Sequence, residues 1–290
     1  MQRALATGDR SGLDLRGFGV TSVVLAAPLG APTAACKRVP PFRDRATFER
    51  YRQVVLHNVD ELRAGGVTVV DTDVRLVEHG GHLVGYVVQP LLPPESLGEA
   101  ILKAAEPSAD HPLVTAMVDH VLAATTERRG IDAQVGNWAV IDGVVSYLDV
   151  TTPFSVDERG ELEMDLDVFL TSGPPPLRPL YRRELPKSMT RWLDARHALV
   201  DLVGNLYKLD LDGWVEPIIE ATRGRVDPPI SVTEAREYYD GEVKTWTLLH
   251  KVLVGYAWWQ RTVRRQVPSG FVPPADYDPA AWKAKQRAWN

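Results

Sequence analysis

GIDAQVGNWAVIDGVVSYLDVTTPF, residues 130–154, is the stretch that decides how the rest of the chain is interpreted. Two short apolar runs, 138–141 and 144–148, stand on either side of Asp142-Gly143. An Asp-Gly pair between two such runs is typical of a β-hairpin with a tight turn. The pattern therefore predicts a loop, a hairpin and a second loop that returns to the end where the first one stands.

Three oxygen-bearing side chains flank this predicted hairpin. Asp132 precedes Asn137 by five residues and Asp149 by seventeen, so the hairpin would bring Asp149 back beside Asn137. Carboxylate and amide oxygens are hard ligands, and Mg²⁺ combines such ligands with water and substrate phosphates. The sequence thus predicts a magnesium site at one end of a rigid ribbon.

In its order and spacing, the stretch resembles the catalytic loop and metal loop of the protein-kinase-like fold, which read D-x-x-x-x-N, then a hairpin, then Asp. The form D-x-x-x-G-N, met here by Asp132, Gly136 and Asn137, is similar to the branch of aminoglycoside phosphotransferases and choline kinases. The resemblance implies that Asp132 is the catalytic base. It also implies that Asn137 and Asp149 hold Mg²⁺, and that the nucleotide is ATP.

Two positions depart from that pattern. The His that usually stands two residues before the base is Gly130 here, and Val150-Thr151 replaces the Phe-Gly that usually follows the metal Asp. By resemblance, the His mainly orients other groups and takes no part in the reaction. Its absence therefore leaves the reacting groups, Asp132, Asn137 and Asp149, in place.

The N-terminal part contains the residues that would hold the nucleotide. Residues 13–27 show a strand–turn–strand pattern, with a G-x-G-x-x-S turn formed by Gly17, Gly19 and Ser22. Glycines let a backbone approach phosphate groups closely because they have no Cβ. The next predicted strand, 33–39, carries Lys37 twenty residues after Gly17. The resemblance implies a glycine-rich loop and a lysine that pairs with the α- and β-phosphates of ATP.

Residues 44–64 are predicted to form one helix, because apolar side chains recur at three- and four-residue steps until Gly65-Gly66. By resemblance this helix supplies a glutamate to Lys37. Glu49 is the candidate on the expected side, Glu61 lies near the end of the helix, and Gln53 is a non-acidic alternative.

Two further strands are predicted over 68–77 and 82–89. The text after them, VVQPLLPPESL, resembles the hinge where backbone groups meet adenine, which assigns Gln89 and Leu91 to the nucleotide site. Pro90 has no N–H, so Leu91 is the expected backbone donor. The predicted fold is α+β and bilobal: an N-lobe of antiparallel sheet with one helix over 1–90, and a mainly helical C-lobe over 91–290.

The C-terminal half is predicted to be helical over 95–105, 111–128, 187–209, 213–223, 232–244 and 246–266. The aromatic residues Tyr256, Trp258 and Trp259 are expected to lie in the core.

The acidic run 157–167 follows the metal loop, where the resemblance places the acceptor. Its acids Glu161, Glu163, Asp165 and Asp167 alternate with apolar residues, as on one face of a solvated strand. The alternative is an acidic wall that attracts a cationic acceptor.

Composition excludes several classes of protein. The 290 residues have a net charge of −5 and no long basic run, which argues against nucleic acid as the main partner. The single cysteine, Cys36, fits a reducing compartment. No stretch has the length and hydrophobicity needed to span a bilayer, and no secretion signal is visible. A cytoplasmic protein without a membrane partner is therefore expected.

The predicted activity is ATP-dependent transfer of the γ-phosphate to a hydroxyl, on a small molecule such as an aminoglycoside-like natural product or on a peptide Ser or Thr. A pseudokinase that binds nucleotide and serves as a scaffold for a partner enzyme is the alternative from another class. Transfer of a nucleotidyl group is a third reaction compatible with the same residues. Either a homodimer or a partner enzyme is compatible with the sequence.

Overall fold

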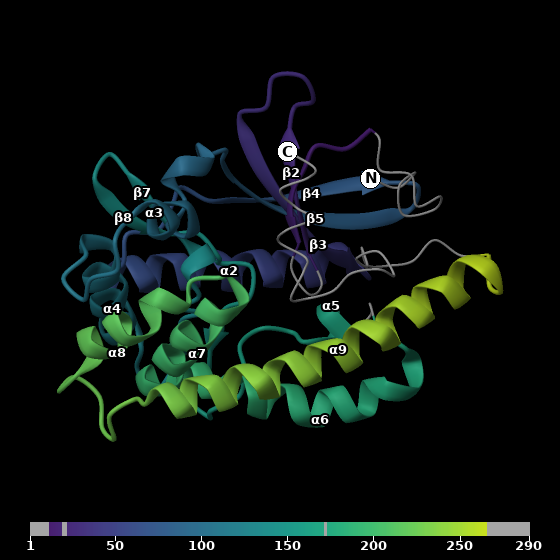
Figure 1. The fold of residues 1–290 in the computed structure, drawn as a ribbon. Helices are drawn as coiled ribbons and strands as arrows, with labels where there is room; N and C mark the ends of the chain where they lie inside the picture. The colour runs from purple at the N-terminus through teal and green to yellow at the C-terminus, as the bar shows by residue number, and fades with distance from the viewer. Residues whose placement is uncertain (1–11, 19–21, 171–172, 266–290) are drawn as a thin grey trace.

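The computed structural model describes residues 12–18, 22–170 and 173–265 (Figure 1). The chain is α+β, with an antiparallel sheet near its N-terminus and a mainly helical remainder, as the sequence predicts at this level. A single cluster of buried apolar side chains runs from the sheet through the helices, so both parts contribute to one core.

Five antiparallel strands form the main sheet in the order β1-β2-β3-β5-β4. Consecutive strands of this sheet pair as neighbours, except that β3 and β4 are separated along the chain by a helix, α2 (Arg45–Ala64), and β3 pairs with β5. The strands are β1 (Leu15–Phe18), β2 (Val23–Ala27), β3 (Ala34–Phe42), β4 (Asp73–His79) and β5 (His82–Pro90). The domain boundary predicted at residues 90–91 therefore falls at the end of β5.

Helix α2 (Arg45–Ala64) occupies the predicted position and packs against β3. Asp44 begins it by accepting a hydrogen bond from the Thr47 N–H at 2.7 Å, which satisfies one of the free donors of the first turn. The apolar stripe of the helix is buried, and the Phe42 ring of β3 lies 5.3 Å from the ring centroids of both Phe48 and Tyr51. This packing fixes α2 relative to the strand that carries Lys37.

The predicted hairpin is confirmed by β7 (Trp138–Ile141) and β8 (Val144–Tyr147), whose pairing closes at Ile141 and Val144. Asp142 and Gly143 have φ angles of 51° and 81°, the left-handed values that a two-residue hairpin turn requires. A second small ribbon pairs β6 (Arg129–Gly130) with β9 (Phe154–Ser155). The β6–β9 ribbon therefore joins the two ends of the stretch 130–154, and the β7–β8 hairpin lies within it.

The remaining elements are helical, and α7 (Ala195–Lys208) has nine of its fourteen residues buried. The other helices are α3 (Gly98–Ala104), α4 (Pro112–Ala124), α5 (Asp167–Leu170), α6 (Arg178–Met189), α8 (Val215–Thr222) and α9 (Val232–Thr262), with short 3₁₀ turns η1 (Pro94–Ser96), η2 (Val135–Asn137), η3 (Pro175–Leu177), η4 (Thr190–Leu193) and η5 (Asp212–Trp214).

Several predicted boundaries are wrong. The strand predicted over 68–77 begins only at Asp73, as β4. Before it, Val69 forms an isolated parallel bridge with Tyr147. The helix predicted over 111–128 ends at Ala124. The helix predicted over 187–209 is interrupted at Asp194, whose side chain caps α7 by accepting from the Arg196 N–H.

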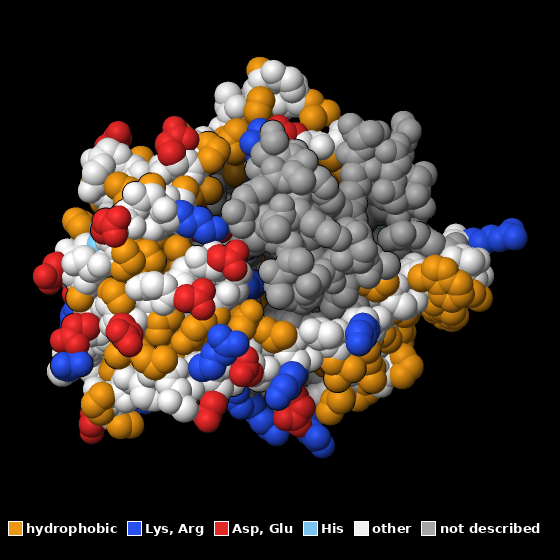
Figure 2. All heavy atoms as spheres, in the orientation of Figure 1, with side chains coloured by type: hydrophobic (Ala, Val, Ile, Leu, Met, Phe, Trp, Pro, Cys, Tyr) orange, Lys and Arg blue, Asp and Glu red, His pale blue; other side chains and the backbone are white. Residues whose placement is uncertain are grey.

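The two helices predicted over 232–244 and 246–266 are one continuous helix, α9, because no proline separates them. Two of the three aromatic residues expected in the core are exposed, Trp258 at 60% and Trp259 at 37%, while Tyr256 is half-buried. Hydrophobic side chains gather on the outer end of α9 in Figure 2. The expectation of a buried aromatic face is therefore wrong for both tryptophans.

Candidate functional site

The loop that carries Asp132 begins directly after β6, where the chain passes close to η4. A Cβ on Gly130 would lie 2.0 Å from the Trp192 carbonyl oxygen, so this position accepts no side chain. The close backbone contact leaves no room here for a side chain, including the histidine that the resemblance predicts. Ile131 is buried at 1% exposure, and Asp132 is partly buried.

The loop from Asp132 to Asn137 is closed by hydrogen bonds of its own. The Asp132 carboxylate accepts from the Gln134 N–H at 3.2 Å, and the Asn137 amide nitrogen donates to the Asp132 carbonyl at 3.1 Å. The Leu148 N–H donates to the Asn137 carbonyl at 2.8 Å. The second loop therefore returns beside the first, as the hairpin pattern predicts.

Lys37 and Asp149 form an ion pair across the site. The Lys37 ammonium lies 2.7 Å from Asp149 Oδ1, and the two side chains are 21% and 24% exposed. The same oxygen accepts hydrogen bonds from the Thr151 N–H and hydroxyl. A residue of β3 and a residue 112 positions later along the chain thus meet at one partly buried point.

Burial, and then the negative charge of Asp149, raise the pKa of Asp132 to about 6. Burial also acts to raise the pKa of Asp149, but the charge and hydrogen bond of Lys37 and the hydrogen bonds of Thr151 hold it below its ordinary value. The two carboxyl groups consequently differ at neutral pH in how readily they accept a proton.

The loop containing Asp149 is held by side chains that the sequence analysis did not single out in this role. Tyr51 of α2 is buried and donates its hydroxyl hydrogen to the Thr151 carbonyl at 2.9 Å. Gln89 of β5 donates to the Leu148 carbonyl at 2.8 Å and to the Thr72 hydroxyl at 3.0 Å. Gln89 was expected beside adenine, whereas in the structure its amide positions the loop that carries Asp149.

Asp201 of α7 is a further acidic residue near the site that the sequence analysis missed. It is 1% exposed, accepts a hydrogen bond from the Tyr238 hydroxyl at 2.6 Å and is bonded by the Asn205 amide at 3.0 Å. Burial, and then the charge of Asp132, raise its pKa to about 8. A lone aspartate inside the apolar run ALVDLV is the signal that could have identified it.

Three residues proposed as partners of Lys37 lie elsewhere. The Glu49 side chain is 55% exposed and stands 3.8 Å from Arg52, and Gln53 is exposed. Glu61 pairs with Arg129 at 3.0 Å. These side chains occupy the outer side of α2, while its inner side carries apolar residues and Tyr51, so the expected helix glutamate is replaced by Asp149 as the lysine's partner.

The residues predicted to contact the nucleotide occupy different kinds of position in the structure. Gly17 pairs with Val24 in the β1–β2 ladder, and Ser22 is buried at 7% exposure just before β2, while Gly19 lies outside the described residues. The Leu91 N–H donates to the Thr33 carbonyl at 3.0 Å. The expected adenine donor is therefore already occupied, because the β3–β5 ladder continues by one more hydrogen bond.

The acidic run does not form the alternating strand face that was expected. Only Leu162 makes a bridge, to Val156, after a turn at Gly160. Asp167 is bound by the Arg182 guanidinium through two hydrogen bonds, of 2.9 and 2.8 Å. That pairing neutralises one acid of the proposed wall.

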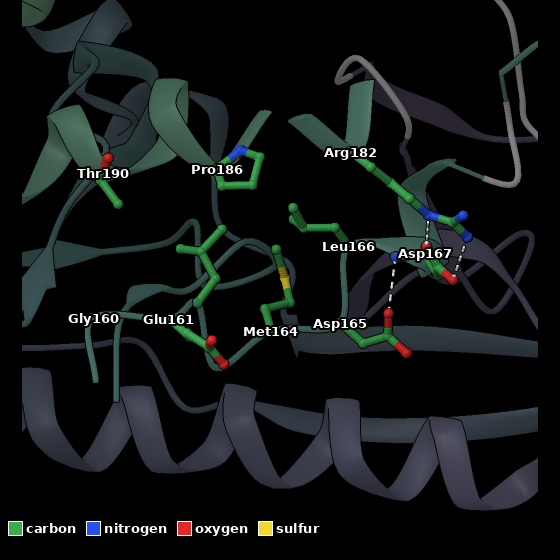
Figure 3. A pocket seen from close by; sticks show the side chains of 10 residues that line it. Gly160, Glu161, Met164, Asp165, Leu166, Asp167, Arg182, Pro186 and Thr190 are labelled. Atoms are coloured by element: carbon green, nitrogen blue, oxygen red, sulfur yellow. Dashed lines mark hydrogen bonds and ion pairs between the residues drawn. The ribbon is translucent and has the colours of Figure 1, made fainter. Parts of the chain in front are cut away.

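A cavity of about 570 Å³ lies between this run and α6 (Figure 3). Met164 and Leu166 point from the run toward Pro186 of α6, and Glu161 and Asp165 stand at the rim. The cavity thus has an apolar interior with acidic groups at its edge.

Within the described residues, no group of three or more His, Cys, Asp and Glu side chains is arranged to hold a metal ion alone. The donors that are present nevertheless suit a shared Mg²⁺. Lys37 and Thr151 both contact Oδ1 of the Asp149 carboxylate, so Oδ2 is the oxygen that a cation would use. The Asn137 nitrogen bonds to Asp132, so its amide oxygen faces the other way.

A family model described as a family of unknown function, DUF6206, matches residues 3–255. The chain belongs to DUF6206. The match covers the described sheet, α2, both ribbons and most of α9, so the site lies within the part of the chain that the family shares. No protein with a curated description matches the chain. In the described part of this DUF6206 chain, no helix has both the length and the apolar character needed to cross a membrane.

Proposed function

We propose that this DUF6206 chain is an ATP-dependent O-phosphotransferase with a bilobal, kinase-like fold divided near residues 90–91. The observation that carries the proposal is the contact of Lys37 with Asp149 at 2.7 Å, beside the loop that holds Asp132 and Asn137. Four residues suited to phosphoryl transfer, one from β3 and three from the stretch 132–149, would thus act at one point.

Phosphoryl transfer depends mostly on positioning and on neutralising charge. Asp149 and Asn137 would hold Mg²⁺, which would supply positive charge to neutralise the phosphates. Lys37 would release part of its contact with Asp149 and bind the α- and β-phosphates. Since Tyr51 and Gln89 fix the loop that carries Asp149, this ligand would keep its place when Lys37 moves.

Asp132 would accept the proton of the acceptor hydroxyl. Its raised pKa of about 6 makes it a stronger base than an exposed aspartate while leaving it mostly ionised at neutral pH. The cavity beside α6 supports an acceptor with an apolar body, and Glu161 and Asp165 at its rim favour a cationic group on it. A small natural-product amine and a basic peptide both meet this description.

One observation favours the scaffold alternative. The Leu91 N–H is bonded to Thr33, so adenine would have to be held without the donor that the hinge resemblance assigns. A protein that binds nucleotide only as a structural ligand would tolerate such a change. The retained Lys37, Asp132, Asn137 and Asp149 set favours the enzyme.

Phosphate transfer from γ-labelled ATP to a panel of amine-bearing hydroxyl compounds and basic peptides tests the proposal. Asp132→Asn preserves the shape of the side chain and removes the base, so turnover should fall by roughly 10²–10⁴-fold while Mg-ATP still binds. If the Asp132→Asn variant kept its full activity, or fully supported a partner enzyme, the phosphotransferase proposal would be wrong and the scaffold proposal would replace it.

A further inference from the structure

The second half of α9, together with the three residues that follow it, has a charge unlike that of the rest of the chain. Residues 243–265 contain no Asp or Glu and five basic residues, Lys244, Lys251, Arg261, Arg264 and Arg265. The whole chain has a net charge of −5 and this segment +5, so the remaining residues carry −10. A strongly basic segment on an otherwise acidic protein is typical of a surface that binds an anionic partner.

Exposed apolar side chains lie on the same segment. Leu248 is 67% exposed, Trp258 60%, Trp259 37% and Val263 57%. At 100° per residue these four fall on one side of the helix, and we call them the tryptophan face. Lys251 projects from the same side, and the Arg264 guanidinium lies 5.2 Å from the Trp259 ring centroid.

The first half of α9 is fixed to the body of the protein, and its far end extends outward while Ala257, on the side opposite the tryptophan face, is buried. Ala235 is buried, Tyr238 is bonded to Asp201, and α7 is the main neighbour of α9. In Figure 1 the yellow end of α9 extends beyond the other labelled elements. Figure 2 shows hydrophobic side chains at that end, with basic ones beside and beyond them. A surface that approached this end would therefore meet the tryptophan face without first meeting the body.

We infer that the outer half of α9 docks on an anionic lipid surface. Trp rings settle at the level of lipid headgroups, and Leu248 and Val263 can enter the acyl boundary beside them. The basic residues are attracted by anionic headgroups, and the segment has no acid that would oppose this attraction. The helix would lie on the membrane and would not span it.

This inference revises the sequence-based expectation of no membrane partner. That expectation rested on the absence of a stretch long enough to span a bilayer, which is a different property from lying on its surface. A second copy of the chain is less suitable, because a two-fold contact would place the same basic residues against one another.

The test uses the full chain and vesicles of phosphatidylcholine with about one-third phosphatidylglycerol, compared with phosphatidylcholine alone. We expect sedimentation with the anionic vesicles at about 0.1 M salt, a blue shift of tryptophan emission, and release at about 0.5 M salt. Trp258→Gln/Trp259→Gln and Arg264→Gln/Arg265→Gln should each weaken the partition coefficient by about tenfold or more.

Arg223→Gln/Arg225→Gln is the matched control, since it removes the same charge from exposed arginines near the end of α8. It should bind vesicles like the parent chain, and unchanged melting temperatures show that the variants fold. Three results would overturn the inference: no binding, equal binding to neutral and anionic vesicles, or equal weakening in the control. A concentration-dependent dimer that Trp258→Gln/Trp259→Gln abolishes, without vesicle binding, would assign the face to a second copy.

Discussion

Asp132 and Asp149 have the same side chain, but their surroundings move their pKa values in opposite directions. Asp132 is partly buried near a like charge and has no basic residue bonded to it in the described part of the chain, whereas Asp149 has the ammonium of Lys37 at 2.7 Å. The residue with the raised pKa suits proton transfer, and the residue with the lowered pKa suits a permanent negative ligand.

The proposed base predicts a pH dependence of kcat/KM. Because Asp132 must be ionised to accept a proton, and its pKa is raised to about 6, the rate should rise with pH through about 6 and level off above it. Steady-state rates from about pH 5 to about pH 8 measure this. A profile that is flat across this range would contradict the role of Asp132, and Asp132→Asn should lack the rise.

Asp201 predicts a pH dependence of stability. Its pKa is raised from the ordinary 3.8 to about 8, so the folded state holds its proton more tightly and loses stability as pH increases between those values. Asp201→Asn keeps an acceptor for Tyr238 and cannot ionise. We expect its melting temperature, relative to the parent chain, to rise steadily from about pH 4 to about pH 8. A constant difference between the two proteins would show that Asp201 does not titrate in this way.

At the scale of elements, the start of the loop that carries Asp132 depends on contact between β6 and η4. A Cβ at Gly130 would lie 2.0 Å from the Trp192 carbonyl oxygen, and neither backbone can move without disturbing the ribbon. Gly130→Ala should therefore reduce the free energy of unfolding by about 3 kcal/mol or more. Gly136→Ala is the control in the same loop, because a Cβ there meets nothing within 4 Å.

Denaturant unfolding of both variants measures this difference. Gly136→Ala should change stability by about 1 kcal/mol or less. If the two variants had equal stabilities, the contact with η4 would not be what keeps residue 130 a glycine.

The loop between β9 and α5 predicts how a cationic acceptor is recognised. Glu161 lines the cavity, whereas Glu158 stands in the same exposed turn and does not. Glu161→Gln should raise KM for a cationic acceptor by about two- to fivefold at low salt and leave KM for ATP unchanged. Glu158→Gln should leave both unchanged. If the two substitutions changed KM equally, the proposal that the acceptor binds in this cavity would be wrong.

Local signals in the sequence predicted some elements well. The Asp142-Gly143 turn, the β7–β8 hairpin and α2 were all predicted, because the turn chemistry, the apolar spacing and the glycines after the helix each act within a few residues. The meeting of Asp132, Asn137 and Asp149 followed from that hairpin.

Other features depend on packing between distant segments and could not be predicted locally. The partner of Lys37 was expected on α2 and is Asp149, since Tyr51 and apolar residues occupy the inner side of that helix. Leu91 was expected to be a free donor, but the β3–β5 ladder reaches it. The exposure of Trp258 depends on where α9 points, which its own sequence does not determine.

At the scale of the molecule, the site is a junction between the sheet and the helical part. Lys37 of β3, Tyr51 of α2 and Gln89 of β5 all contact the loop 148–151, while Asp132 belongs to the loop after β6. A ligand that bridged these groups would connect both parts of the chain, and its binding should therefore stabilise the whole fold.

The most direct test of the proposed function is calorimetric titration of the chain with ATP, with Mg²⁺ present or with a chelator, together with the melting temperature in each state. We predict that ATP binds more tightly and raises the melting temperature more with Mg²⁺, and that Asp149→Asn loses most of this difference because one charged ligand is removed. Equal ATP binding with Mg²⁺ and with the chelator, or no binding in either, would contradict the account.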